Sequence, residues 1–176
     1  MRQTSFAAMQ CSLARSLEMV GDWWSPLILR DLALGPRRFD ELAVDLGISR
    51  NLLATRLEGL AVDGIVTRLR YLDHPPRYRY QLTQAGVDLV PVLMALTAWG
   101  DRWATPDDGP PIRYRHRTCG HVFTPTVCCS SCAEAVSSES VHVLPGPGGR
   151  PGPGTMLTGE FIGARLMNGD EVDTKR

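Results

Sequence analysis

Net charge and lysine are the first things that this sequence lacks. Its 19 acidic residues balance 19 basic residues, of which only Lys175 is a lysine. Net charge therefore gives no indication of nucleic acid or of any other charged partner. We attribute the dominance of arginine to genomic base composition.

Long apolar runs are also missing. No run approaches the roughly 20 residues that a transmembrane helix needs, and Gln10, Ser12 and Arg15 interrupt the start of the chain where a signal peptide would be apolar. We therefore expect a cytoplasmic protein without membrane contact. Cytoplasmic thiols stay reduced, so clustered cysteines there are expected to bind metal or respond to oxidants rather than form structural disulfides.

Composition divides the chain into four zones, without a visible internal repeat. Residues 1–104 carry apolar residues at helical spacing, and residues 105–112 form a Pro/Gly/Asp linker. Residues 113–144 contain four of the five cysteines. Residues 145–176 begin with "PGPGGRPGPG", which predicts a flexible spacer followed by a disordered tail.

The first zone predicts five helices and one β-hairpin, which makes the fold class mainly α with a small β wing (α+β). Ser25, Ser49 and Thr83 are the expected helix N-caps, and Pro91 is expected to kink the last helix. The expected helices are 11–20, 25–34, 38–46, 50–63 and 84–103, and the expected strands are 65–72 and 77–83.

A helix, a short turn at Gly47, a longer helix and a hairpin follow one another in the order of a winged helix-turn-helix. The second helix of such a unit enters the major groove, and a basic wing contacts phosphates. The predicted DNA contacts are Arg37, Arg38, Ser49, Arg50, Asn51, Thr55, Arg56, Arg68, Arg77 and Arg79, with Arg70 also in the basic hairpin. No pattern of residues predicts an enzyme.

The same pattern has a second interpretation. Pairs of helices of this kind occur in proteins that never touch DNA, and Glu58 and Asp63 offset the arginines of the second helix. The alternative is a winged helix that docks protein, with the Cys/His zone as its contact surface. Duplex binding with a steep dependence on salt would exclude it.

A series of motifs runs from Cys11 to Gly100 without a gap. After Cys11 come "GDWW" before "LILRDL", "GPRRFDEL", "GISRNLLATRLEGLAVDGIV", "PPRYRYQLTQAG" and "PVLMALTAWG". In these motifs the chain resembles the HxlR family of bacterial winged-helix transcriptional regulators. The family often has Gly-Gly-Lys-Trp where this chain has Gly21-Asp22-Trp23-Trp24, which puts a phosphate contact at Asp22 in doubt.

The resemblance implies a homodimer formed by the terminal helices, with two recognition helices on a palindromic operator in double-stranded DNA. We expect repression rather than activation, and a small-molecule effector remains unidentified. The apolar surplus between Leu89 and Trp103 independently favours a dimer. Some members of the family sense oxidants or electrophiles through a cysteine at the position of Cys11. The alternative for Cys11 is a buried, unreactive thiol.

The Cys/His zone contains two short pairs of metal-binding side chains. His116 and Cys119 form the first pair and Cys129 and Cys132 the second, each with two residues between its members. This spacing is typical of zinc knuckles, so we predict a degenerate zinc ribbon with a structural zinc ion on these four residues. His121 could replace His116, and Cys128 could replace Cys129. A thiol-based redox cluster, or no site at all, is the alternative.

Overall fold

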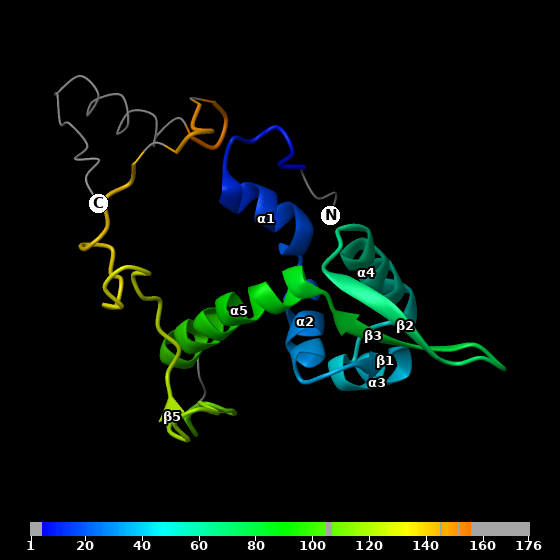
Figure 1. Ribbon diagram of the computed structural model, residues 1–176. Coiled ribbons are helices and arrows are strands. Elements are labelled where there is room, and N and C mark those ends of the chain that lie inside the picture. The colour runs from blue at the N-terminus through cyan, green and yellow to red at the C-terminus, as the bar shows by residue number, and fades with distance from the viewer. Residues whose placement is uncertain (1–4, 105–106, 145, 151, 156–176) are drawn as a thin grey trace. The chain divides into compact units, whose positions relative to one another are not determined.

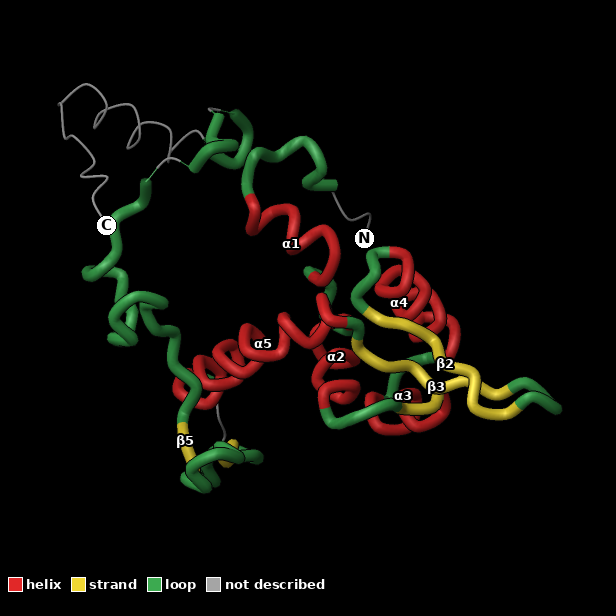
Figure 2. Tube along the Cα trace, in the orientation of Figure 1, coloured by secondary structure: helices red, strands yellow, loops and turns green. Residues whose placement is uncertain are grey.

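The computed structural model describes residues 5–104, 107–144, 146–150 and 152–155. The chain divides into two compact units, which are described separately: Met1–Gly21 with Ser137–Arg176, and Asp22–Val136. The predicted tail at 156–176 lies outside the described residues. The helices (Figures 1 and 2) are α1 (Ser12–Val20), α2 (Ser25–Ala33), α3 (Phe39–Leu46), α4 (Arg50–Val62) and α5 (Gln84–Trp103), and the strands are β1 (Arg37–Arg38), β2 (Val66–Leu72), β3 (Arg77–Leu82), β4 (Tyr114–Arg115) and β5 (Val122–Phe123).

The larger unit contains a winged helix-turn-helix, as the sequence predicts. Its three-stranded antiparallel sheet has the order β1-β3-β2, and β2 and β3 extend together as the wing. Leucines and isoleucines at helical spacing on α2, α3 and α4 form the core, because that spacing places them on one face of each helix. The fully buried side chains are Ile28, Leu29, Leu42, Leu53, Leu57, Leu60 and Val66.

Strand β1 is absent from the prediction. Arg37 pairs with Tyr80 and Arg38 pairs with Arg79, so the two residues before α3 form the edge of the sheet. Two residues are too few for an alternating pattern to be recognised in a sequence. The pairing places both arginines beside the wing.

The predicted cap of α2 is wrong. Ser25 is the first residue of the helix rather than its cap, and its side chain is buried. The Asp22 carboxylate takes the capping role, since its Oδ1 accepts from the backbone N–H groups of Trp24 (2.8 Å) and Ser25 (3.1 Å) and its Oδ2 accepts from the Ser25 hydroxyl. The position that departs from the family pattern thus stabilises the start of α2.

The other two predicted caps are confirmed. Ser49 Oγ accepts from the N–H of Leu52 at the start of α4, and Thr83 Oγ1 accepts from the N–H of Gly86 at the start of α5. The Thr83 hydroxyl also contacts the Gly64 carbonyl at 2.6 Å. A Cβ on Gly86 would lie 2.5 Å from the Ile65 carbonyl, so only glycine allows α5 to pack this closely on the start of β2. Helix α5 continues through Pro91.

In the smaller unit, the segment before α1 is held by Glu18. Its carboxylate accepts from the Phe6 N–H (2.6 Å) and the Ser5 hydroxyl (2.8 Å), and these bonds lower the pKa of Glu18. The described part of the predicted spacer also makes contacts, because the Gln10 N–H donates to the Pro153 carbonyl at 3.0 Å. Among the described helices, none is both long and apolar enough to span a bilayer.

Candidate nucleic-acid interface

The recognition helix α4 is oriented by its apolar face. Leu53, Leu57 and Leu60 are buried, and Gly47, in the left-handed conformation (φ 61°), ends α3 and makes the turn into α4. Four of the predicted contacts are exposed on the N-terminal half of α4: Ser49, Arg50, Asn51 and Thr55. This half of the helix is the part that reads bases in helix-turn-helix proteins.

These four side chains are not equally free to contact DNA bases. Ser49 caps the helix, and the Thr55 hydroxyl donates to the Asn51 carbonyl at 3.0 Å. The Asn51 amide has no hydrogen bond to another described residue that would compete with a base. An asparagine amide can donate and accept at the same time, which matches the major-groove edge of adenine.

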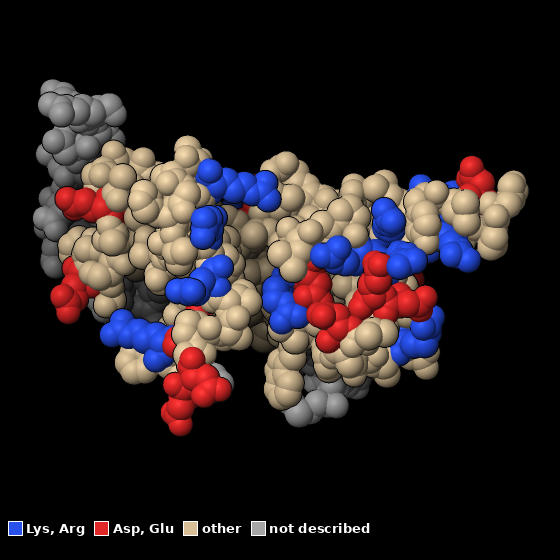
Figure 3. All heavy atoms as spheres, turned by 90° about the horizontal axis from the view of Figure 1, so that it is seen from below, with Lys and Arg blue, Asp and Glu red and all other residues tan. Residues whose placement is uncertain are grey.

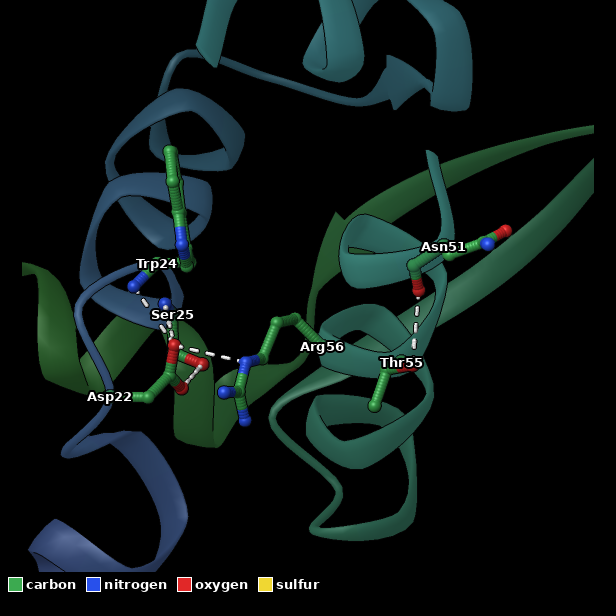
Figure 4. A network of polar contacts seen from close by, with 6 residues as sticks. All are labelled: Asp22, Trp24, Ser25, Asn51, Thr55 and Arg56. Atoms are coloured by element: carbon green, nitrogen blue, oxygen red, sulfur yellow. Dashed lines mark hydrogen bonds and ion pairs between the residues drawn. The ribbon is translucent and has the colours of Figure 1, made fainter. Parts of the chain in front are cut away.

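Arg56 points away from this surface. Its Nε lies 3.2 Å from Asp22 Oδ1, within ion-pair distance although without the angle of a hydrogen bond. Figure 4 shows Arg56 reaching from α4 toward the start of α2, while Asn51 projects from the other side of the helix. Its side chain is 32% exposed and that of Asp22 is 12% exposed. This geometry favours a structural role for Arg56, which positions α4 against α2.

Carboxylates on helix α3 form ion pairs with two of the arginines that are predicted to contact DNA. Arg50 Nη1 lies 2.6 Å from Asp40 Oδ1, with its guanidinium 4.9 Å from the Phe39 ring centroid. Arg38 binds Glu41 through both its side chain (2.8 Å) and its backbone N–H (2.6 Å). These bonds lower the pKa of Glu41 and raise that of Arg38. Both pairs are exposed, so phosphates can compete for the arginines.

The wing distributes its arginines over two faces. Arg68 lies opposite Tyr80 on one face, while Arg79 lies opposite Leu69 and beside Arg38 on the other. Arg77 shares the face of Arg79, since residues two apart on a strand point to the same side. Each face has an arginine against a tyrosine ring: Arg68 is 4.0 Å from the Tyr78 centroid, and Arg79 is 4.8 Å from that of Tyr71. Sequence reasoning missed both tyrosines, although the alternation of Arg and Tyr in "RYRY" (77–80) indicates Tyr78; Tyr71 follows Arg70 on the facing strand.

Figure 3 shows arginine side chains along the wing beside a group of acidic side chains. The acids on α3 are Asp40, Glu41 and Asp45, and Asp73 at the wing tip pairs with Arg70 at 3.1 Å. The predicted contacts that make no ion pair within the described residues are Arg37, Arg68, Arg77 and Arg79. They are the cations best placed to bind phosphates.

The Cys/His zone forms two small hairpins with a ligand pair on each. His116 Nδ1 lies 3.3 Å from Cys119 Sγ on the first hairpin. On the second, the backbone N–H groups of Cys132 and Ser131 donate to the Cys129 sulfur and lower the pKa of that thiol. Across the described residues, no three His, Cys, Asp or Glu side chains come together as a metal site. The predicted zinc site stays a prediction.

All five cysteines are free thiols. Cys11 precedes α1 and is half-buried, and a Cβ on Gly154 would lie 3.3 Å from the Cys11 Cβ. This thiol is therefore neither fully enclosed in a core nor fully open to solvent.

The HxlR-like helix-turn-helix family model matches residues 19–108. An uncharacterized HTH-type transcriptional regulator of Mycobacterium tuberculosis is 43% identical over 137 residues, which are 78% of this chain and 87% of that protein. A second one, from Synechocystis, is 37% identical over 94 residues, which are 53% of this chain and 70% of that protein. A stretch of 137 residues in a chain of 176 includes the whole Cys/His zone up to Cys132, wherever it begins.

Solved structures agree with these relatives. The candidate transcription factor PA1607 matches with a TM-score of 0.70 and 31% identity, covering 80% of this chain and 98% of that one. The redox regulator HypR in its oxidized form matches with a TM-score of 0.51 and 29% identity, covering 55% of this chain and all of that one. The matching family model, the relatives and the winged helix agree: the chain belongs to the HxlR-like helix-turn-helix family of transcriptional regulators.

Proposed function

We propose that the protein is a homodimeric regulator that binds a palindromic operator and represses the adjacent genes. The observation that carries sequence-specific binding is the exposed Asn51 amide on the N-terminal half of α4. The wing arginines that make no ion pair within the described residues support binding to phosphates. Repression is the simpler mode, because a dimer lying across an operator excludes other proteins by occupancy alone.

The dimer is supported by an apolar stripe on α5. Val92, Leu96, Trp99 and Trp103 recur at intervals of four, three and four residues, so they lie on one face of the helix. Their exposed fractions are 58, 56, 61 and 64%, which is unusual for large apolar side chains within one face of a soluble helix. A second copy of the same helix would cover this stripe through a two-fold interface.

The operator can be obtained by selecting bound duplexes from a random pool and measuring affinity by fluorescence anisotropy. Asn51→Ala is expected to weaken binding to the selected duplex by about 1–3 kcal/mol while leaving binding to unrelated DNA unchanged. Glu58→Gln, on the same helix but two turns away, is the control and should alter all duplexes alike. If Asn51→Ala loses the same affinity for every duplex sequence, Asn51 does not read a base.

A redox response through Cys11 is the finer part of the proposal. It is supported by the position of Cys11 before α1, by its partial exposure, and by the similarity to HypR, which is described as a redox regulator. Mild diamide treatment should change operator affinity in the wild type and not in Cys11→Ser. If both proteins respond equally, or neither responds, Cys11 is not a sensor.

A further inference from the structure

The two hairpins of the Cys/His zone repeat one backbone design. In the first, the His116 N–H donates to the His121 carbonyl (2.9 Å) and the Gly120 N–H donates to the His116 carbonyl (2.8 Å). In the second, the Cys129 N–H donates to the Glu134 carbonyl (2.8 Å) and the Ala133 N–H donates to the Cys129 carbonyl (2.9 Å). Adding 13 to each residue number of the first set gives the second set. The repeat is not recognisable in the sequence, because the corresponding positions carry different residue types.

The repeat extends to the backbone conformation of both turns. Gly120 and Ala133, the residues after the second member of each pair, are both left-handed, with φ of 74° and 60°. Ala133 is the one non-glycine residue with positive φ in the described part of the chain. A side chain disfavours this conformation, so the second turn adopts the shape of a knuckle against the preference of its own sequence.

The backbone pattern shared by the two hairpins distinguishes the proposed ligands from the adjacent cysteine and histidine residues. His116 and Cys129 occupy the first position of each turn, and Cys119 and Cys132 occupy the fourth. Cys128 corresponds to Arg115, before the first turn, and pairs through its backbone with Ala135. His121 corresponds to Glu134, after the turn. Neither Cys128 nor His121 lies within a knuckle.

The distance within the first pair also fits a metal. Two ligands at roughly 2.1 and 2.3 Å from a tetrahedral zinc ion lie about 3.5 Å apart, and His116 Nδ1 lies 3.3 Å from Cys119 Sγ. Backbone N–H groups of Cys132 and Ser131 already point at the Cys129 sulfur. Three sulfurs and one imidazole nitrogen favour zinc over harder cations such as magnesium.

The connection between the hairpins allows the two pairs to meet. Only Thr124, Pro125 and Thr126 separate β5 from Val127. Each turn lies at the end of its hairpin opposite this connection, so hairpins laid side by side bring both turns to the same end. Four apolar side chains would then gain cover: Val122, Phe123, Val127 and Val136 are 52, 37, 61 and 41% exposed.

We propose that His116, Cys119, Cys129 and Cys132 bind one zinc ion that joins the two hairpins into a ribbon, and that Cys128 stays a free thiol. The ion supplies the stabilisation that a segment with so few apolar residues lacks, so binding and closure occur together. The proposal is independent of the operator, since none of these residues belongs to the recognition helix or the wing.

The test is metal content by elemental analysis on the full chain, purified without chelator and dialysed against zinc. We expect one zinc per chain in the wild type and in Cys128→Ser and His121→Ala, and loss of zinc in Cys129→Ser and His116→Ala. Cys128 and Cys129 are adjacent, so each variant controls for the other. Less than half an equivalent in the wild type, or loss of zinc in Cys128→Ser with retention in Cys129→Ser, overturns the assignment.

Thiol counting keeps the proposal testable if the ligand variants do not fold. In a Cys11→Ser background, zinc-loaded protein should expose one thiol that reacts rapidly with Ellman's reagent, namely Cys128, and chelation should raise the number to four. Four rapidly reacting thiols both before and after chelation would overturn the site. Operator binding by the same samples is scored separately, so failure of the DNA-binding proposal remains distinguishable.

Discussion

Asp22 shows how one carboxylate can serve two helices. It caps α2 and lies within ion-pair distance of Arg56 on α4, with both side chains largely enclosed. The sequence resemblance put a phosphate contact at Asp22 in doubt, and the helical spacing of α4 predicted Arg56 as a DNA contact. Neither prediction included the ion pair between Asp22 and Arg56, because these residues are 34 positions apart (22 and 56) and their pairing depends on how the helices pack.

We expect Asp22→Ala to lower the free energy of unfolding by about 1–2 kcal/mol through loss of the cap, with the partly buried Arg56 left without its partner. Asp40→Ala is the matched comparison, since its pair with Arg50 is exposed on both sides, and should give no resolvable change. Urea unfolding followed by circular dichroism measures both. Equal effects of the two substitutions would show that burial of the Asp22 pair is unimportant.

Asp31 makes the stability of the folded chain depend on pH. Burial raises its pKa above the ordinary value of 3.8, although the hydrogen bond from Arg30 acts in the opposite direction, and its Oδ2 has no hydrogen-bond partner. The folded state therefore holds the proton more tightly than the unfolded chain does. The stabilisation from this group is complete below pH 3.8 and declines as the pH rises through the folded-state pKa.

The asparagine in Asp31→Asn cannot titrate, so this variant should not lose stability as the pH rises through the folded-state pKa of Asp31. Its free energy of unfolding, compared with that of the wild type, should rise as the pH increases above 3.8 and level off above the folded-state pKa of Asp31. Asp63→Asn, at the exposed end of α4, is the control for the exchange of an aspartate for an asparagine. A difference for Asp31→Asn that shrinks with rising pH would mean that the pair with Arg30 outweighs burial.

At the scale of elements, much of the architecture could be predicted. Apolar spacing at Leu53, Leu57 and Leu60 located α4, and the switch to alternation in "RYRYQL" located β3. The pairing of β1 with β3 could not be predicted, because it follows from the tertiary position of Arg37 and Arg38 rather than from a local pattern. The faces of the wing likewise required the register.

Helix α5 carries the prediction on assembly. Leu96→Glu places a charge in the middle of the exposed apolar stripe, so we expect a monomer at micromolar concentration and weaker operator binding, since one half-site contact is lost. Analytical ultracentrifugation and anisotropy measure the two effects. Ala85→Glu, on the first turn of the same helix, is the control for added charge. A dimer that survives Leu96→Glu would place the interface elsewhere.

For the whole molecule, a net charge of zero conceals a local surplus. Among the arginines predicted to contact DNA, four per chain (Arg37, Arg68, Arg77 and Arg79) make no ion pair within the described residues, so the proposed dimer offers eight to phosphates. The logarithm of operator affinity should fall against that of salt concentration with a slope of about −7. Arg79→Ala, which removes two of the eight contacts, should make the slope shallower by about 2.

Titrations between low and moderate salt, by anisotropy, measure these slopes. Lys175→Ala removes one positive charge from each chain outside the winged helix and is the control. A slope near zero in the wild type would favour the alternative in which the winged helix docks protein. Substitution of the four residues proposed to bind zinc, by contrast, should leave the slope unchanged, since these residues lie outside the recognition helix and the wing.

The contact of Gly154 with Met9 and Cys11 links sequence positions near the two ends of the chain. Its φ of 87° disfavours any residue other than glycine, and a Cβ added there would lie 3.2 Å from Met9 Cβ. The surroundings of the Cys11 thiol therefore include a residue 143 positions later (11 to 154). Under the redox response proposed for Cys11, removal of the chain from Gly154 onward would change the surroundings of the sensing thiol and leave the recognition helix unchanged.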